Sequence, residues 1–250
     1  MEEPSWSKHR VNERTNLSVP ISCEGCPIGA CAIYAPAFRK DPGSITALRR
    51  AQRILDPRHT IIREGQILKE VYTLFSGWAY RFTLFGDGRR QIFSFLLPGD
   101  FITYQCMAGS PAPFSITTIT PVALCVFDPL EMAEFLVHSR EQVEYLCQIS
   151  FNHAAAVDRR LAAIGRRSAI GRIAQLLLEL HTRLSKRGLV NANKFALPLR
   201  QEHIADALGL TTIYVNRTLA RLRNQRVISF RREEMEILDL SRLRELAGEG

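Results

Sequence analysis

The stretch Gln201-Glu-His-Ile-Ala-Asp-Ala-Leu-Gly-Leu-Thr-Thr-Ile-Tyr-Val-Asn-Arg-Thr-Leu-Ala220 predicts two short helices joined by a tight turn. Ala205 is small enough for two helices to cross closely over it, and Gly209 can adopt the left-handed conformation that ends a helix. Thr211 or Thr212 can cap the second helix through its hydroxyl oxygen. The pattern is typical of a helix-turn-helix, whose second helix enters the major groove of DNA.

Apolar and polar residues follow one another along this stretch with helical spacing. The residues expected to face inward are Ile204, Leu208, Leu210, Val215 and Leu219. The candidate DNA contacts are the residues at the start of the motif and those facing outward: Arg200, Gln201, Thr211, Thr212, Ile213, Asn216, Arg217 and Arg221. Arg217 is the favoured residue for direct readout, because a guanidinium can donate two hydrogen bonds to guanine. A helical hairpin with a merely solvated polar face is the alternative.

The sequence around this motif points to the same class of partner. Val227 to Leu238 predicts two short strands around a charged turn, which is the pattern of a wing. From Arg166 to Gly250 the chain has 16 basic and 9 acidic residues, so nearly all of the net charge of +8 lies in the last third. This excess favours nucleic acid, because Lys and Arg release counterions when they neutralise phosphates.

Upstream of the motif, the chain has a β pattern. From Ile54 to Phe127, short runs rich in β-branched and aromatic residues alternate with turn signals at regular spacing. Trp78 to Leu84 and Gln91 to Leu97 flank Gly86-Asp87-Gly88 and predict a hairpin, because glycine supplies the positive φ of a tight turn. We therefore expect an antiparallel barrel or roll.

A long helix is predicted between these two regions, from Ser139 to about Ile164. Its apolar stripe can pack against the roll or against the same helix of a second copy. The two-fold symmetry of helix-turn-helix proteins favours the dimer. The seam would then contain Leu146, Val157, Leu161 and Ile164. A hinge is predicted at Gly165-Arg166-Arg167-Ser168, with Ser168 capping the next helix, Ala169 to Ser185.

Length and composition indicate the number of folded units and the class of protein. The 250 residues suit two folded units. We expect an N-terminal cysteine segment over residues 1–45, a sensor over 46–137, the long helix over 138–165 and the DNA-binding domain over 166–250. The chain has no apolar run long enough to span a membrane and no secretion signal, so a cytoplasmic location is expected. It also has no nucleotide-binding glycine loop, nucleophile elbow or paired carboxylates, which argues against an enzyme.

Six cysteines in a cytosolic chain suggest metal ligands, redox sensing or buried thiols, because that compartment keeps thiols reduced. Cys23, Cys26 and Cys31 fall within nine residues. Cys106 and Cys147 have no partner motif and are expected to be small buried hydrophobic residues.

In order and spacing, these features resemble the CRP/FNR family of transcription regulators over roughly Cys23 to Leu240. The marks are the roll turns at Gly65, Ser76-Gly77, Gly86-Asp87-Gly88 and Pro98-Gly99-Asp100, followed by the helix-turn-helix. The resemblance implies an α+β fold: an N-terminal cyclic-nucleotide-binding-type antiparallel β-roll, a long dimerisation helix and a C-terminal winged helix-turn-helix. It also implies a homodimer on palindromic double-stranded DNA, with RNA polymerase as a further partner.

Family members that bind cyclic AMP carry a Gly-Glu-Leu segment and an Arg-Ser pair. The matching places look like Gly99-Asp100-Phe101 and Phe114-Ser115-Ile116, which lack the glutamate and the arginine. We expect no cyclic nucleotide, because a buried phosphate without a cationic partner carries a heavy desolvation cost.

The oxygen-sensing branch of the family holds an iron–sulfur cluster with three cysteines near the N-terminus and a fourth in a late strand of the roll. Cys23, Cys26 and Cys31 look similar to the first three and Cys125 to the fourth, which implies a [4Fe–4S] cluster that responds to oxygen or nitric oxide. The gap between Cys26 and Cys31 is one residue shorter than in the best-known member. The alternatives are a zinc site, a dithiol redox switch and a regulator without a cofactor.

A second departure lies in the recognition helix. The branch reads its operator through an E-x-x-S-R arrangement, and the matching run here, Ile213-Tyr214-Val215-Asn216-Arg217, keeps only the arginine. Ile213 can touch a thymine methyl group but cannot accept a hydrogen bond, so the operator is expected to differ at one position in each half-site.

Overall fold

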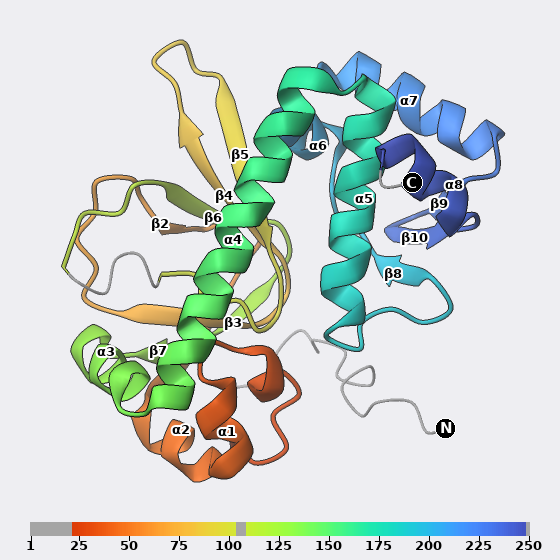
Figure 1. Cartoon of the computed structure of the whole chain (residues 1–250). Coiled ribbons are helices and arrows are strands. Elements are labelled where there is room, and N and C mark those ends of the chain that lie inside the picture. Colours follow the sequence, from red (N-terminus) through yellow and green to blue (C-terminus); the bar gives the residue numbers. More distant parts are fainter. Residues whose placement is uncertain (1–21, 104–108, 249–250) are drawn as a thin grey trace.

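The structure, a computed structural model, describes residues 22–103 and 109–248 (Figure 1). The chain forms a small helical base, a β-roll, one long helix across the roll and a C-terminal helical unit beside it. This architecture confirms the predicted fold class. Among the described residues, no helix is both long and apolar enough to cross a membrane.

Two short helices of the base follow a 3-10 turn at Gly29–Cys31: α1 (Ala35–Lys40) and α2 (Pro42–Leu48). The Asp41 side chain caps α2 by accepting a 2.9 Å hydrogen bond from the backbone N–H of Gly43. Sequence analysis did not predict either helix. Their packed residues include Ile33, Tyr34 and Ile45, which form a core with the end of the roll.

The roll consists of two antiparallel sheets, ordered β1-β7-β3 and β2-β6-β4-β5. The predicted hairpin is confirmed as β4 and β5, which pair from Ala79↔Leu96 to Leu84↔Arg90. Fully buried Leu74, Ile116 and Leu124 lie between the sheets. The strands are β1 (Arg49–Leu55), β2 (Thr60–Ile62), β3 (Val71–Ser76), β4 (Ala79–Leu84), β5 (Arg90–Leu96), β6 (Ser115–Thr118) and β7 (Val122–Phe127).

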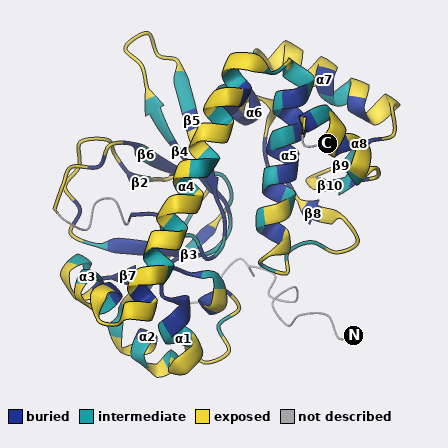
Figure 2. Cartoon of the chain, viewed as in Figure 1, coloured by how far each residue is buried: buried dark blue, intermediate teal, exposed yellow. Residues whose placement is uncertain are grey.

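After α3 (Pro129–Val137), the long helix α4 runs over Arg140–Arg166, close to its predicted bounds, and the Ser139 hydroxyl caps it by accepting from the backbone N–H of Gln142. Figure 2 shows both exposed and partly buried positions along α4, and the residues of its predicted apolar stripe differ in what covers them. Leu146 packs on the core of the base, and Ile164 is half-buried against the C-terminal unit. Val157 and Leu161 point into solvent, 50% and 70% exposed. Only these two of the four predicted seam residues are therefore free for a second copy.

The C-terminal unit begins with α5 (Ala169–Ser185), which Ser168 caps through the backbone N–H of Gly171 at 3.3 Å, as predicted. It continues with β8 (Lys194–Ala196), α6 (Gln201–Leu208), α7 (Thr212–Asn224), β9 (Ile228–Arg231), β10 (Glu234–Ile237) and α8 (Leu240–Ala247). The predicted wing is confirmed as the β9–β10 hairpin. Strand β8, which sequence analysis missed, extends it to a three-stranded sheet.

Candidate functional site

The helix-turn-helix forms through the local contacts that its sequence predicts. Gly209 has φ +62° and ends α6 in the left-handed region. Thr211 caps α7, since its hydroxyl oxygen accepts a 3.3 Å hydrogen bond from the backbone N–H of Tyr214. Ala205, where the helices cross, is buried, as are Ile204 and Val215.

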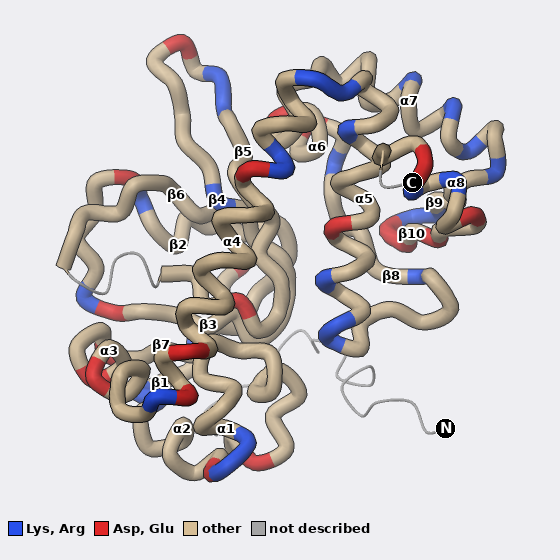
Figure 3. The backbone as a smooth tube through the Cα atoms, in the orientation of Figure 1, with Lys and Arg blue, Asp and Glu red and all other residues tan. Residues whose placement is uncertain are grey.

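The candidate DNA contacts lie together on the outer surface of this motif. All eight are exposed: Arg200, Gln201, Thr211, Thr212, Ile213, Asn216, Arg217 and Arg221. Helix α7 carries Arg217, Arg221 and Arg223 and no acidic residue, so all of its charged side chains are basic (Figure 3). A basic helix face with its polar side chains free is suited to the negatively charged major groove.

Sequence analysis missed Tyr214, which is 58% exposed in the first turn of α7. It follows Ile213 and precedes Arg217 by one turn, so it belongs to the same outer surface. An aromatic residue beside outward Thr and Ile residues at a helix start was the signal available in the sequence.

His203 ties the start of α6 to its cap. The ring Nδ1 accepts a 3.2 Å hydrogen bond from the backbone N–H of Arg200, so this nitrogen must be unprotonated. Burial lowers the pKa of His203, with Arg90 and Arg200 acting in the same direction and Glu202 opposing them. The neutral ring is therefore the form that the folded state favours.

Stability is accordingly expected to fall as pH drops. A depressed histidine pKa contributes stability above its unfolded value of about 6.5, and this stability is lost as pH falls toward the folded value. His203→Gln keeps an acceptor for the cap but does not titrate. Its unfolding free energy should decline less between pH 7.5 and 5 than that of the unaltered protein, as measured by urea denaturation. Equal slopes would contradict this role.

The four candidate ligand cysteines gather at the junction of the base and the roll. Cys125 is buried on β7, the central strand of its sheet, and Cys23 lies in the same core. Cys26 is close enough to act electrostatically on each of the other three thiols, Cys23, Cys31 and Cys125. The fold thus brings close together two segments about 100 residues apart in sequence.

Burial favours the protonated form of three of these thiols, Cys26, Cys31 and Cys125. Burial raises the pKa of Cys26 and of Cys31, and it raises the pKa of Cys125 to about 11. A hydrogen bond from the Gln52 amide and the nearby Arg49 guanidinium oppose the shift at Cys125. Within residues 22–103 and 109–248, no group of three or more His, Cys, Asp or Glu side chains is arranged to hold a metal ion.

The other two cysteines, Cys106 and Cys147, are not among the four candidate ligands. Cys147 is exposed on α4, so its expected burial is wrong: it falls on the side of the helix that faces away from the roll. Cys106 lies outside the described residues.

At the two places matched to nucleotide-binding motifs, the side chains have other partners. The Asp100 carboxylate pairs with Arg183 and Arg187 of the C-terminal unit. Phe114 is buried beneath the Arg81 guanidinium, 4.7 Å from its ring centre.

Comparison with known proteins agrees with this architecture. The Crp-like helix-turn-helix domain matches residues 171–246, and the cyclic nucleotide-binding domain matches residues 52–139. The nitrogen fixation regulation protein FixK of Bradyrhizobium diazoefficiens is 30% identical over 226 residues, which is 90% of this chain and 93% of that protein. The chain belongs to the CRP/FNR family.

Other CRP/FNR proteins are similar along nearly the whole chain. The fumarate and nitrate reduction regulatory protein of Vibrio cholerae is 23% identical over 91% of both chains. The structure of FixK2 from Bradyrhizobium japonicum superposes with a TM-score of 0.70 at 25% identity, covering 78% of this chain and 96% of that one. The protein is thus a DNA-binding transcription regulator of the CRP/FNR type.

Proposed function

We propose that this CRP/FNR regulator binds palindromic operators as a homodimer and that an oxygen- or nitric-oxide-sensitive iron–sulfur cluster controls it. The DNA contacts would be the outer residues of the helix-turn-helix, with Arg217 reading a guanine in each half-site. Val157 and Leu161, exposed on α4, support the dimer, because apolar side chains in one helical stripe are stabilised by covering each other. RNA polymerase would be a further partner at promoters.

The observation that carries the sensing proposal is the gathering of Cys23, Cys26, Cys31 and Cys125 from two segments at one junction. Four soft sulfur donors suit iron–sulfur chemistry, so the donor set fits the group. When bound, the cluster would supply a redox-reactive centre. The raised pKa values of Cys26, Cys31 and Cys125 mean that metal binding must displace protons from these three thiols.

The chain's own residues connect this junction to the dimer helix. Gln142 is buried on α4, and its side-chain amide donates a 2.6 Å hydrogen bond to the carbonyl of Ile33, two residues after Cys31. A shift of the cysteine segment would therefore displace the N-terminal half of α4. We infer that the state of the cysteines alters how α4 meets its counterpart.

Anaerobic purification tests the cluster. The unaltered protein should show a broad visible absorption band with bound iron and sulfide, and both should be lost in air together with DNA affinity. Cys125→Ser should lose most of the iron, because one of four ligands is removed. Cys147→Ser is the matched control and should keep the band, since this exposed cysteine lies outside the set. A colourless, iron-free protein that binds DNA normally would contradict the proposal.

A thiol switch is the second candidate function. It is favoured by one observation: among the described residues the cysteines form no disulfide, and no three of them are arranged to hold a metal ion. In that case the anaerobic protein would lack iron, and oxidation alone would change DNA affinity.

A further inference from the structure

The roll and the DNA-binding unit share one continuous hydrophobic core. Trp78, Tyr80, Ile92 and Phe95 of the roll pack with buried residues of α5 and α6. Polar contacts border this core. Arg90 of β5 pairs with Asp206 of α6 at 2.6 Å, and Arg160 of α4 pairs with Glu179 of α5 at 2.8 Å. The DNA-binding unit is therefore held by the roll as well as by the chain connection.

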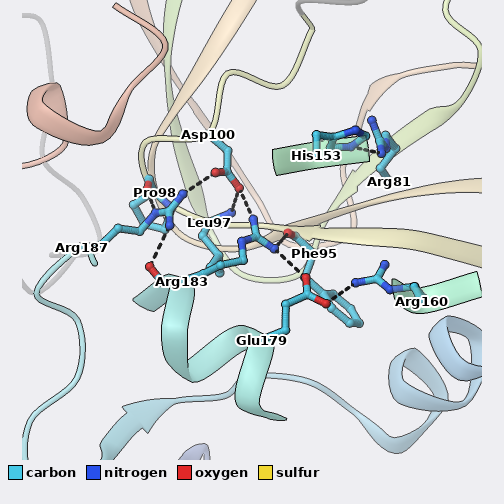
Figure 4. Close-up of polar contacts among 10 residues, drawn as sticks. All are labelled: Arg81, Phe95, Leu97, Pro98, Asp100, His153, Arg160, Glu179, Arg183 and Arg187. Atoms are coloured by element: carbon cyan, nitrogen blue, oxygen red, sulfur yellow. Dashed lines mark hydrogen bonds and ion pairs between the residues drawn. The ribbon is translucent and has the colours of Figure 1, made fainter. Parts of the chain in front are cut away.

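Asp100 is the centre of the contact with α5 (Figure 4). Its Oδ2 accepts from the Arg183 guanidinium at 2.6 Å and from the backbone N–H of Leu97 at 2.8 Å, while Oδ1 accepts from Arg187. Arg187 also donates to the carbonyl of Pro98 at 2.7 Å. The carboxylate of Asp100 is only 18% exposed, so solvent screens these charge-assisted bonds weakly.

The same turn, Leu97 to Asp100, is also contacted by the cysteine segment, since Cys31 lies against Gly99. Gly99 has φ +92°, and the Sγ of Cys31 lies 2.5 Å from where a Cβ on Gly99 would be. The thiol also donates to the carbonyl of Ile28 at 3.2 Å, which fixes its direction. No side chain could occupy this position without displacing Cys31.

The turn is in addition held firmly in the roll. Gly99 donates to the carbonyl of Leu74 at 2.7 Å, and Leu74 donates to the carbonyl of Asp100 at 2.9 Å. Because Gly99 and Asp100 are adjacent and both hydrogen-bond to the backbone of Leu74, a displacement at Gly99 is transmitted to Asp100 rather than absorbed by a loose loop.

We propose that the Leu97–Asp100 turn couples the cysteine segment to the DNA-binding unit. A displacement of Cys31 moves Asp100, and Asp100, as the positioning residue, then changes the position of α5 relative to the roll. The physiological signal rests on the proposed function, but the mechanical coupling does not. Because coupling between two sites is reciprocal, Arg187 must affect the cysteine segment as much as Cys31 affects α5.

Hydrogen–deuterium exchange of the iron-free, full-length protein tests this coupling in both directions. Asp100→Asn keeps the shape of the side chain but removes its charge, and it should raise exchange of the amides of residues 183–190 about ten-fold. Cys31→Ala should raise exchange at the same amides. Arg187→Gln should raise exchange at Cys31 and Ala32, whose amides both donate to Ile28. In the double variant C31A/D100N, exchange at these amides should be less than two-fold faster than in the faster of the two single variants.

Two control variants match these changes. Asp87→Asn makes the same substitution in an exposed turn of the roll, where Asp87 pairs only with Arg89 of that turn among the described contacts. Cys147→Ala removes a cysteine that lies on α4. Both should leave exchange at residues 183–190 unchanged.

Independent, multiplicative effects of C31A and D100N would overturn the coupling, as would a C31A protein with unaltered exchange at α5. Absence of iron in the anaerobic protein would contradict the proposed cluster alone, because the exchange cycle is measured without iron. The two failures are therefore distinguishable.

Discussion

Replacing Arg217 with alanine is expected to lower operator affinity about 1000-fold. Arg217 is exposed on the outer face of α7, where a forked guanidinium can bind guanine O6 and N7. Loss of one such contact costs about 2 kcal/mol, and a symmetric dimer loses two, or about 4 kcal/mol. Fluorescence anisotropy on a duplex selected by the unaltered protein from a randomised symmetric library measures the change.

Two further variants separate base readout from simple charge. Arg217→Lys keeps the charge but not the fork, so it should retain non-specific binding while losing preference for the selected duplex. Arg242→Ala removes an arginine from α8, where it pairs with Glu245 at 2.7 Å. It should weaken binding less than three-fold. If R217A and R242A lose affinity equally, Arg217 contributes only charge.

Leu161→Glu is expected to convert the protein to a monomer at micromolar concentration. Leu161 is 70% exposed on α4, in line with exposed Val157 one turn earlier. A carboxylate in each copy would meet its counterpart in a water-poor seam, so the dimer dissociation constant should rise at least about 1000-fold. Sedimentation velocity measures this shift directly.

Leu130→Glu is the matched control, because Leu130 is 75% exposed on α3 and lies outside the proposed seam. This variant should remain a dimer. A dimeric L161E protein would place the interface on another face. The monomer should also bind the selected duplex far more weakly, because the two half-sites of the duplex would then be occupied by separate molecules rather than by one dimer.

Features of the sequence that act locally were predicted correctly. Ser168 and Thr211 cap helices through neighbouring backbone N–H groups, and Gly209 ends α6, because such contacts depend on residues within one turn. The β4–β5 hairpin followed from its glycine-rich loop for the same reason.

Features that depend on distant partners were not predictable. Strand β8 has only three residues, and it is a strand because it pairs with β10, which lies about 40 residues away in the sequence. The α4 stripe was misassigned in part, because apolar periodicity does not tell which of two partners covers each residue. Leu146 meets the base, whereas Leu161 meets solvent. Asp100 was assigned to a nucleotide motif, yet its partners lie more than 80 residues away.

The core that extends from Trp78 and Phe95 into α5 limits how modular this regulator can be. A roll exchanged for that of a relative would have to bring aromatic residues of matching shape, or leave the apolar side of α5 facing water. Its acidic turn would also have to meet two arginines spaced four residues apart. Recombination within such a chain therefore requires compatible surfaces on both units, so the roll and the DNA-binding unit are constrained to diversify together.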